Sequence, residues 1–271
     1  MNDPRDETMP PLDSIICGDN VATMSTFPDA CIDLVVTSPP YDNLRTYGGH
    51  SWDFEGVAHQ LWRIIKPGGV VVWIVADATI DGSETGTSFR QALRFKEIGF
   101  RLHDTMIWQK HTFSLPFPNR YHQIFEFMFV LSNGEPTFNP IMDMKNAHAG
   151  ERRSVTVRER DGRTTRRTDK IIAENGKRNN LWRCVAHVQR GKGVHPAPFP
   201  ESLARDHILS WSNEGDIVLD PFAGSFTTCK MARLLGRRWI GIEINEAYCE
   251  IGRKRLKERL LPFTAQQDAM V

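Results

Sequence analysis

The segment Thr37–Tyr41, with the sequence Thr-Ser-Pro-Pro-Tyr, combines groups that suit the recognition of a planar amine. It follows the apolar run Ile32–Val36, which predicts a buried strand, and the two prolines end the strand ladder and stiffen its exit. The Ser38 hydroxyl and the Pro39 carbonyl oxygen can accept two hydrogen bonds from an exocyclic amino group, while Tyr41 stacks on the ring that carries it. Purine and pyrimidine bases carry such groups. Taken alone, the five residues fit a stiff loop with one aromatic residue equally well.

A second candidate site lies near the other end of the chain. The apolar run Asp216–Leu219 leads into the turn Asp220–Ser225, and a helix is expected to begin at Thr227. Small residues in such a turn let a ligand approach the backbone, and the helix start offers free N–H groups. The next apolar run ends at Glu243, which is placed to accept hydrogen bonds from ribose hydroxyls. Because Gly224 is the only glycine in the turn, the pattern favours an adenosine ligand without a pyrophosphate over a nicotinamide or flavin dinucleotide.

Apolar runs alternate with helical segments along most of the chain. This pattern predicts an α/β fold with a doubly wound, mostly parallel, seven-stranded sheet. The expected strands are Ser14–Cys17, Ile32–Val36, Val70–Val75, Thr105–Trp108, Ile124–Leu131, Asp216–Leu219 and Trp239–Ile242. The expected helices are Asn20–Ser25, Phe54–Ile65 (ended by Lys66, Pro67, Gly68 and Gly69), Thr87–Ile98, Phe199–Ser210, Thr227–Leu235 and Glu246–Leu260.

The segment from Asn139 to about Lys192 lacks a sustained apolar period and is too long for an ordinary connection. Its part from Ile141 to Lys192 holds fourteen basic and six acidic residues, a net charge of +8 in a chain whose net charge is +1. A basic insertion on an otherwise acidic body indicates a polyanionic partner, and a solvated loop without a partner is the competing interpretation.

With both motifs in view, the chain resembles the DNA amino-methyltransferases, the N4-cytosine and N6-adenine family that uses S-adenosyl-L-methionine. Ser38–Tyr41 is similar to the family's catalytic (D/N/S)PP(Y/F/W) motif, and Asp220–Thr228 is similar to its cofactor motif DPFAGSGTT. Further similarity lies in Gly18-Asp19, Lys66–Gly69, Trp108, Lys110, His195–Ala197 and Phe199-Pro200. The order of catalytic motif, basic insertion and cofactor motif resembles the beta group, in which the middle segment recognises the target. The resemblance implies the class I S-adenosylmethionine-dependent methyltransferase fold.

The resemblance also implies roles for individual residues. The catalytic residues would be Ser38, Pro39, Pro40 and Tyr41. The cofactor-binding residues would be Asp19, Asp220, Pro221, Phe222, Ala223, Gly224, Ser225, Glu243, His195 and Phe199. The DNA-binding residues would be Arg152, Arg153, Arg158, Arg163, Arg166, Arg167 and Lys110. Two alternatives stay open, since Asp19 also suits the N-cap of a helix at Asn20–Ser25 and His195 suits an ordinary turn.

The implied division of the chain has five parts. These are a flexible N-terminus (1–12), the catalytic half of the methyltransferase domain (13–138), the basic target-recognition insertion (139–192), the cofactor-binding half (193–262) and a flexible tail (263–271).

The implied reaction transfers a methyl group directly to the exocyclic amine of a base flipped out of double-stranded DNA. Ser38 at the first motif position leans toward cytosine N4 over adenine N6. The 5-methylcytosine route needs a cysteine nucleophile, typically after proline, and none of the five cysteines follows a proline.

One residue departs from the family pattern: Phe226 stands where the family usually has glycine. Its benzyl group would either crowd the cofactor or turn into the helix packing. A catalytically impaired DNA-binding relative, or the same chemistry on RNA, is therefore an alternative function.

Composition limits the remaining possibilities. The five cysteines are scattered without any C-x-x-C spacing, so we expect reduced thiols and no metal site. The sequence contains no apolar run of membrane-spanning length and begins with a polar, acidic segment, which predicts a cytoplasmic protein, of bacterial, archaeal or phage origin by the resemblance. The family also suggests a homodimer and, in restriction–modification systems, a partner endonuclease.

Overall fold

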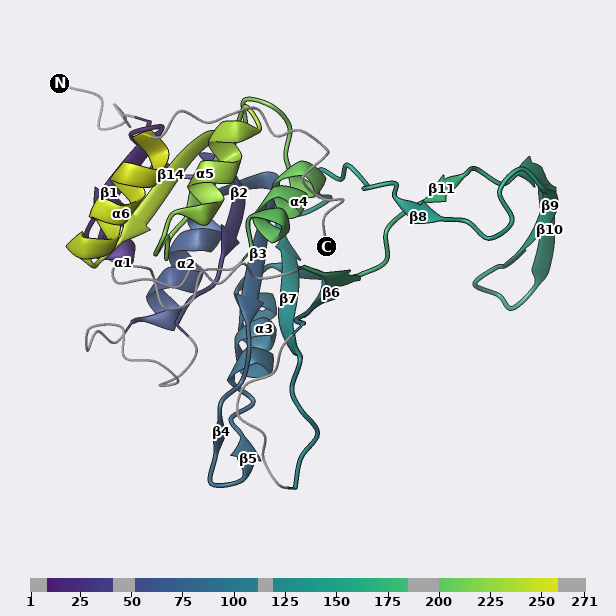
Figure 1. The fold of residues 1–271 in the computed structure, drawn as a ribbon, viewed down its shortest axis with the longest axis horizontal. Coiled ribbons are helices and arrows are strands. Elements are labelled where there is room, and N and C mark those ends of the chain that lie inside the picture. The colour runs from purple at the N-terminus through teal and green to yellow at the C-terminus, as the bar shows by residue number, and fades with distance from the viewer. Residues whose placement is uncertain (1–8, 41–51, 112–118, 185–199, 258–271) are drawn as a thin grey trace. The chain divides into compact units, whose positions relative to one another are not determined.

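The computed structural model describes residues 9–40, 52–111, 119–184 and 200–257. These residues fall into two compact units, one from Pro140 to Asn179 and one from the parts of the chain on either side of it. The larger unit is built on an eight-stranded sheet with the strand order β1-β14-β13-β2-β3-β7-β6-β12 (Figure 1). Its strands are β1 (Ser14–Cys17), β2 (Ile32–Thr37), β3 (Ile65–Val75), β6 (Arg101–Gln109), β7 (Phe125–Ser132), β12 (Leu181–Arg183), β13 (Ile217–Asp220) and β14 (Arg238–Glu243).

All strands of this sheet are parallel except β7, which pairs antiparallel with β3 on one side and β6 on the other. The expected strands are all present, and the doubly wound, mostly parallel fold class is confirmed. The described sheet has one strand more than the seven expected. This is β12, which pairs parallel with β6 from Leu181↔Ile107 to Arg183↔Gln109.

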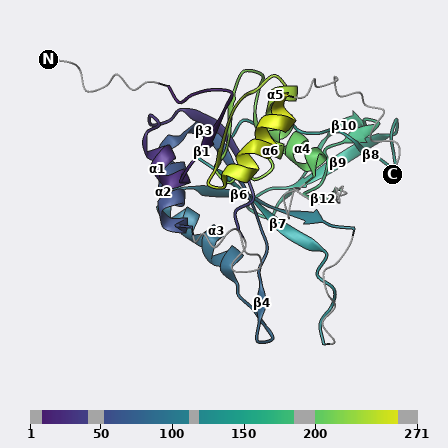
Figure 2. The same ribbon diagram turned by 60° about the vertical axis from the view of Figure 1, so that its left-hand side comes forward.

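Helices cover both faces of the sheet. They are α1 (Asn20–Ser25), α2 (Phe54–Ile64), α3 (Thr87–Ile98), α4 (Glu201–Trp211), α5 (Thr227–Leu234) and α6 (Glu246–Lys257). Helices α1, α2 and α3 lie on one side and α4, α5 and α6 on the other (Figure 2). The parallel strands β2 and β3 are apolar throughout their central parts, because both of their faces are buried under helices. A short antiparallel pair, β4 (Thr79–Ile80) and β5 (Ser83–Glu84), precedes α3.

The helix predicted over Phe54–Ile65 is present as α2 and ends within one residue of its predicted end, whereas the next strand begins five residues before the predicted Val70. The helix ends at Ile64, and Ile65 already pairs with Ile32 as the first residue of β3. The register then jumps, since Leu34 pairs with Val70, so that Lys66–Gly69 bulge out opposite Asp33. The Lys66 ammonium forms an ion pair with the Asp33 carboxylate at 2.8 Å, which fastens this bulge to β2.

The smaller unit, Pro140–Asn179, contains two antiparallel strand pairs. They are β8 (Met144–Lys145) with β11 (Asn175–Gly176), and β9 (Arg152–Arg158) with β10 (Thr164–Ile171). The predicted insertion 139–192 therefore ends too late, because β12 already belongs to the main sheet. The tail 263–271 lies outside the described residues, as do residues 1–8 of the N-terminus.

Candidate active site

The two sequence motifs lie side by side because their strands are neighbours. Strands β2 and β13 pair in parallel, with Val35 opposite Leu219, so their carboxyl ends meet at the same edge of the sheet. The Thr37 hydroxyl donates a 2.7 Å hydrogen bond to the Asp220 carboxylate, and the Thr228 hydroxyl donates a 3.0 Å bond to the carbonyl oxygen of Val36. The segment that precedes Ser38 is thus bonded directly to both ends of the Asp220–Thr228 loop.

Asp220 is a buried carboxyl group in this arrangement. Burial raises its pKa from 3.8 to about 6, while hydrogen bonds from Thr37 and the Phe222 backbone N–H oppose the rise by stabilising the ionised form. The Phe222 N–H lies 3.1 Å from the same carboxylate oxygen that accepts from Thr37. Only 1% of the Asp220 surface is exposed, so its carboxylate joins the two motifs by hydrogen bonds inside the protein.

Glu243 ends β14, the strand next to β13, and its side chain organises the adjacent loops. One carboxylate oxygen accepts from the Gly224 N–H and the other from the Asn245 N–H, both at 2.9 Å. The Glu243 carbonyl oxygen accepts from the Gly18 N–H at 3.0 Å, which joins β14 to the end of β1. Glu243 is half-buried, so the carboxylate that holds the Gly224 turn also faces solvent.

Asp19 is the N-cap of α1. Its carboxylate accepts a 2.8 Å hydrogen bond from the Ala22 N–H, so the N-cap contact expected as one alternative is present. A capping carboxylate can still accept a further hydrogen bond, so cofactor binding by Asp19 stays a prediction. The neighbouring Asn20 side chain donates to the carbonyl oxygen of Pro221 at 3.2 Å. The start of α1 is therefore attached to the Asp220–Ser225 turn, although these two segments lie at opposite ends of the chain.

Around the catalytic motif, Pro39 is buried, whereas Ser38 and Pro40 are half-buried at the end of β2. The half-buried Phe222 ring of the facing loop packs edge-on against Trp52, with the ring centroids 5.1 Å apart. Tyr41, His195 and Phe199 lie outside the described residues.

Phe226 adopts a left-handed backbone conformation (φ 61°), the conformation that a glycine in this place would adopt without strain. Its ring is completely buried and lies between Gly241 of β14 and Gly252 of α6. A Cβ atom built on Gly241 would lie 2.6 Å from the ring, and one built on Gly252 would lie closer still. The two glycines thus make the space that the benzyl group fills, so the ring turns into the packing between β14 and α6, which is one of the two alternatives expected for it.

Arg255 of α6 contacts the Asp220–Ser225 turn, a contact that the sequence interpretation missed. Its guanidinium donates to the carbonyl oxygen of Ser225 at 2.5 Å and to the carboxylate of Glu201 at 2.8 Å. Lys230 binds the same Glu201 carboxylate at 2.7 Å. A charged residue on a highly charged helix gives no sequence signal for this contact, because its partners come from α4 and from the cofactor loop.

The residues predicted to bind DNA have different environments. Arg152, Arg153, Arg158 and Arg163 are exposed in the smaller unit. Arg153 forms an ion pair with Glu151, and Arg163 forms one with Asp161. Arg166 and Arg167 belong to β10, and their side chains lie outside the described part of the structure.

Lys110 belongs to the main unit, immediately after β6. Its ammonium forms a 2.8 Å ion pair with the mostly buried Glu126. This pair gives Lys110 a structural partner within the sheet.

The doubly wound sheet, with a loop at the carboxyl end of β13 and an acidic residue at the end of β14, defines a class I S-adenosylmethionine-dependent methyltransferase. The DNA methylase family of N6 and N4 enzymes matches residues 32–254. The chain belongs to this family, and it is a DNA amino-methyltransferase that uses S-adenosyl-L-methionine.

Individual relatives agree with this family. The chain is 52% identical over 242 residues to the orphan methyltransferase M.BamHII of Bacillus amyloliquefaciens, a match that covers 86% of this chain and 91% of the relative. It is 29% identical over 249 residues to the DNA adenine methyltransferase YhdJ of Escherichia coli K12, covering 90% and 82% of the two chains.

Among solved structures, the cytosine-N4-specific PvuII DNA methyltransferase has the same fold, with a TM-score of 0.67 and 22% identity over 96% of this chain and 90% of that one. The DNA modification methylase TTHA0409 of Thermus thermophilus, solved with S-adenosyl-L-methionine, has a TM-score of 0.61 and 25% identity over 92% and 96% of the chains.

The site of this chain fits the cofactor chemically. Ala223 and Gly224 are small and lie between the ends of β13 and β14. The carboxylates of Asp19 and Glu243 already accept backbone hydrogen bonds, and each can accept a further one from a hydroxyl or amino donor. The burial of Phe226 removes the steric conflict that its side chain suggested. Within the described residues, every helix is too short or too polar to cross a membrane.

Proposed function

We propose that the chain methylates N4 of cytosine in double-stranded DNA, with Ser38, Pro39, Pro40 and Tyr41 holding the flipped base. The Ser38 hydroxyl and the Pro39 carbonyl oxygen accept the two hydrogens of the amine. These hydrogen bonds favour a pyramidal nitrogen, whose lone pair becomes available for attack. The observation that carries the proposal is the bonding of the two motifs through Thr37 and Asp220, which keeps the base-holding segment next to the cofactor loop.

S-adenosyl-L-methionine supplies the methyl group when bound. In the proposed arrangement Glu243 accepts hydrogen bonds from the ribose hydroxyls, and Asp19 lies on the adenine side. The turn formed by Asp220, Pro221, Phe222, Ala223, Gly224 and Ser225 lines the methionine side, and His195 and Phe199, which lie outside the described residues, are assigned to cofactor binding by the family resemblance. Positioning and electrostatics then provide most of the rate enhancement, and no covalent enzyme intermediate is required.

The smaller unit is proposed to carry the DNA-binding surface for target recognition. Its eleven basic residues outnumber its six acidic ones, and Arg152, Arg153, Arg158 and Arg163 are exposed on or next to the hairpin β9–β10. Exposed guanidinium groups neutralise phosphates and displace counterions, which is the main sequence-independent source of DNA affinity. Arg166 and Arg167 of the same unit belong to the proposed set, and Lys110 of the main unit is proposed as a separate phosphate contact.

Adenine N6 is the second candidate, because both amines offer the same two hydrogens. One relative is named as a DNA adenine methyltransferase and one structural neighbour as cytosine-N4-specific. The preference for cytosine rests on serine at the first position of the catalytic motif.

The deciding experiment is nucleoside mass spectrometry of DNA from cells that express the protein or its Ser38→Ala variant. We expect N4-methylcytosine in the first sample and not in the second. N6-methyladenine in its place would overturn the choice of base. The absence of both would overturn the proposed site. Labelled methyl transfer to duplex DNA and to RNA tests the substrate separately.

The resemblance extends the proposal to the protein's surroundings. A cytoplasmic location gives access to DNA and to the methyl donor. A homodimer is tested by light scattering, and a restriction endonuclease partner by co-purification.

A further inference from the structure

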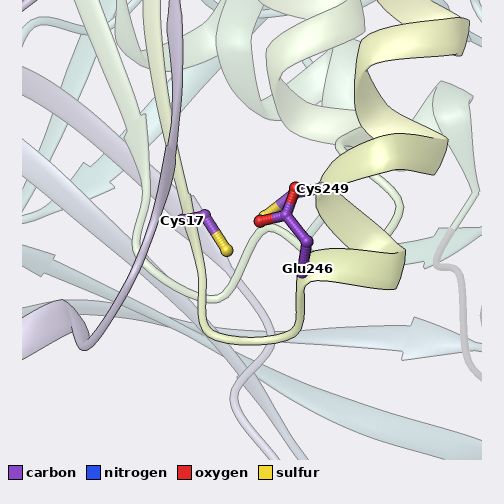
Figure 3. A group of neighbouring side chains, drawn as sticks. All are labelled: Cys17, Glu246 and Cys249. Carbon is purple, nitrogen blue, oxygen red and sulfur yellow. The ribbon is translucent and has the colours of Figure 1, made fainter.

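Three donor groups from two distant parts of the sequence lie together beside β14. They are the thiols of Cys17 and Cys249 and the carboxylate of Glu246, and one ligand atom from each lies within 4.8 Å of the other two. Figure 3 shows the Cys17 sulfur pointing from its strand toward the first turn of α6, where the Glu246 carboxylate and the Cys249 sulfur lie next to each other. Among the described residues, this is the one group of three such ligands.

The fold brings these groups together in a simple way. Cys17 ends β1 and stands opposite Glu243 in the parallel pair of β1 and β14. Glu246 and Cys249 are three positions apart in the first turn of α6, so their side chains lie on the same face of the helix. The Cys249 thiol contacts the carbonyl oxygen of Glu243 at 3.5 Å. Because 232 positions separate the two cysteines in sequence, spacing rules for metal sites cannot detect the cluster.

We propose that Cys17, Cys249 and Glu246 bind one thiophilic divalent cation of the Zn²⁺ type, with water as the fourth ligand. Two thiolates and a carboxylate are ordinary zinc ligands, and a tetrahedral site with metal–sulfur bonds of about 2.3 Å needs sulfur atoms about 3.8 Å apart. Small side-chain rotations bring atoms within 4.8 Å of one another to that separation. Cys17 and Glu246 are exposed and Cys249 is buried. A cation can therefore enter from solvent beside Cys17 and Glu246 and bind the Cys249 sulfur on its buried side.

Binding of the cation changes the protonation of the two thiols. Each thiol gives its proton to solvent as its sulfur binds the cation, so binding releases two protons and leaves a site charge of −1. Arg253 already contacts one oxygen of the Glu246 carboxylate at 2.5 Å, and the second oxygen serves the metal. The bound cation would connect the end of β1 to the first turn of α6, on either side of Glu243.

The test uses Cd²⁺ as the probe, because thiolate–Cd²⁺ bonds give an ultraviolet charge-transfer band. Metal-free, fully reduced protein is titrated, and we expect one equivalent to bind with this band. Cys17→Ser and Cys249→Ser should each abolish the band, and Glu246→Gln should weaken Cd²⁺ binding by more than about 10-fold, the lower end of what even outer-shell changes cost. The matched controls, Cys31→Ser for a buried thiol and Glu97→Gln for an exposed carboxylate on α3, should bind as the wild type does.

A second measurement needs no variant. Alkylation of Cys17 in the wild-type protein, followed by mass spectrometry, should slow strongly on addition of Zn²⁺. The proposal fails if Zn²⁺ leaves this rate unchanged, or if a folded Cys17→Ser variant keeps the Cd²⁺ band. In that case the three groups form only a hydrogen-bonded cluster.

Discussion

At the scale of single residues, the Thr37–Asp220 hydrogen bond joins two motifs that are 183 positions apart in the chain. A buried carboxylate is costly to ionise, and the two groups that stabilise its charge are the Thr37 hydroxyl at the end of β2 and the Phe222 backbone N–H of the Asp220–Ser225 turn. The same atoms that offset the cost of burial therefore fix the geometry of the site. The role of Asp220 depends on the residues that contact it in the folded protein, and the sequence does not show these contacts.

Asp220 makes the stability of the protein depend on pH in a predictable direction. Its pKa is about 6 in the folded protein against an ordinary value of 3.8, so between these values the folded state binds more protons than the unfolded state. The free energy of unfolding should then decrease as the pH rises from about 4 to about 7, by about 3 kcal/mol from this group. Asp220→Asn removes the titration, and the difference in unfolding free energy between wild type and variant, from urea unfolding at several pH values, isolates it. A difference that stays constant with pH would contradict this assignment.

Ser38 is expected to affect the chemical step more than ground-state binding. In the proposed function its hydroxyl accepts a hydrogen bond that strengthens as the amine becomes pyramidal, so Ser38→Ala should lower kcat by about 100-fold, as is typical for one preorganised polar group at a reacting centre. Steady-state methyl transfer to duplex DNA measures kcat, and calorimetry measures S-adenosyl-L-methionine binding, which should not change. The matched control is Ser25→Ala, since Ser25 is a hydroxyl in α1 that bonds within its own helix turn. Unchanged kcat in Ser38→Ala would exclude the proposed role.

At the scale of elements, α6 and β14 provide the space for the side chain of Phe226, a residue that the conformation of the Asp220–Ser225 turn does not require. The Phe226 ring fills the space above Gly241 and Gly252, and its backbone keeps the left-handed conformation of a glycine. The strain of this conformation costs about 1–2 kcal/mol, whereas burial of a phenylalanine ring contributes about 1.5–3 kcal/mol, so the packing offsets the strain. The loop therefore keeps its shape.

This packing predicts a strong coupling between Phe226 and Gly252. Gly252→Ala should destabilise the wild type by about 1–3 kcal/mol through overpacking against the ring. In a Phe226→Gly background the same change should be neutral or stabilising by up to about 1 kcal/mol, because alanine is a better helix former than glycine. Urea unfolding of the four proteins gives the coupling energy, and additive effects would contradict the packing. S-adenosyl-L-methionine affinity of Phe226→Gly should equal that of the wild type, because the ring is turned away from the loop.

The elements also show how far the sequence predicts this fold. All seven expected strands and the helices α1, α3 and α5 follow directly from apolar periodicity and stop signals. Strand β12 escaped prediction because three residues in a basic, polar stretch carry no periodic pattern, and only β6 supplies the partner that makes Leu181–Arg183 a strand. The end of α2 just before Lys66 was predicted, but the inclusion of Ile65–Gly69 in β3 was not, because proline and glycine indicate a break in a helix or a strand alike.

At the scale of the whole molecule, charge is divided between the two compact units. Basic residues exceed acidic ones by five in Pro140–Asn179, whereas the chain as a whole has a net charge of only +1. The main unit contains the two sequence motifs of the proposed active site. Many of its charged side chains form ion pairs within the unit, for example Lys66 with Asp33 and Lys110 with Glu126. This division concentrates the attraction for a polyanion in a part of the chain that is separate from the sheet. The effect on DNA binding should therefore depend on which unit loses charge.

Removing two exposed charges from the hairpin should change the salt dependence of DNA binding. Arg152 and Arg158 are both exposed on β9 and, being six positions apart in a strand, lie on the same face. If both contact phosphates, the Arg152→Ala/Arg158→Ala variant should lower the slope of log K against log salt by about 2, on specific and nonspecific duplexes alike. Fluorescence anisotropy at several salt concentrations measures this slope. The control variant Arg90→Ala/Lys96→Ala removes the same charge from exposed positions of α3 and should leave the slope unchanged. Equal slopes for the two variants would mean that net charge, and not the hairpin, attracts the DNA.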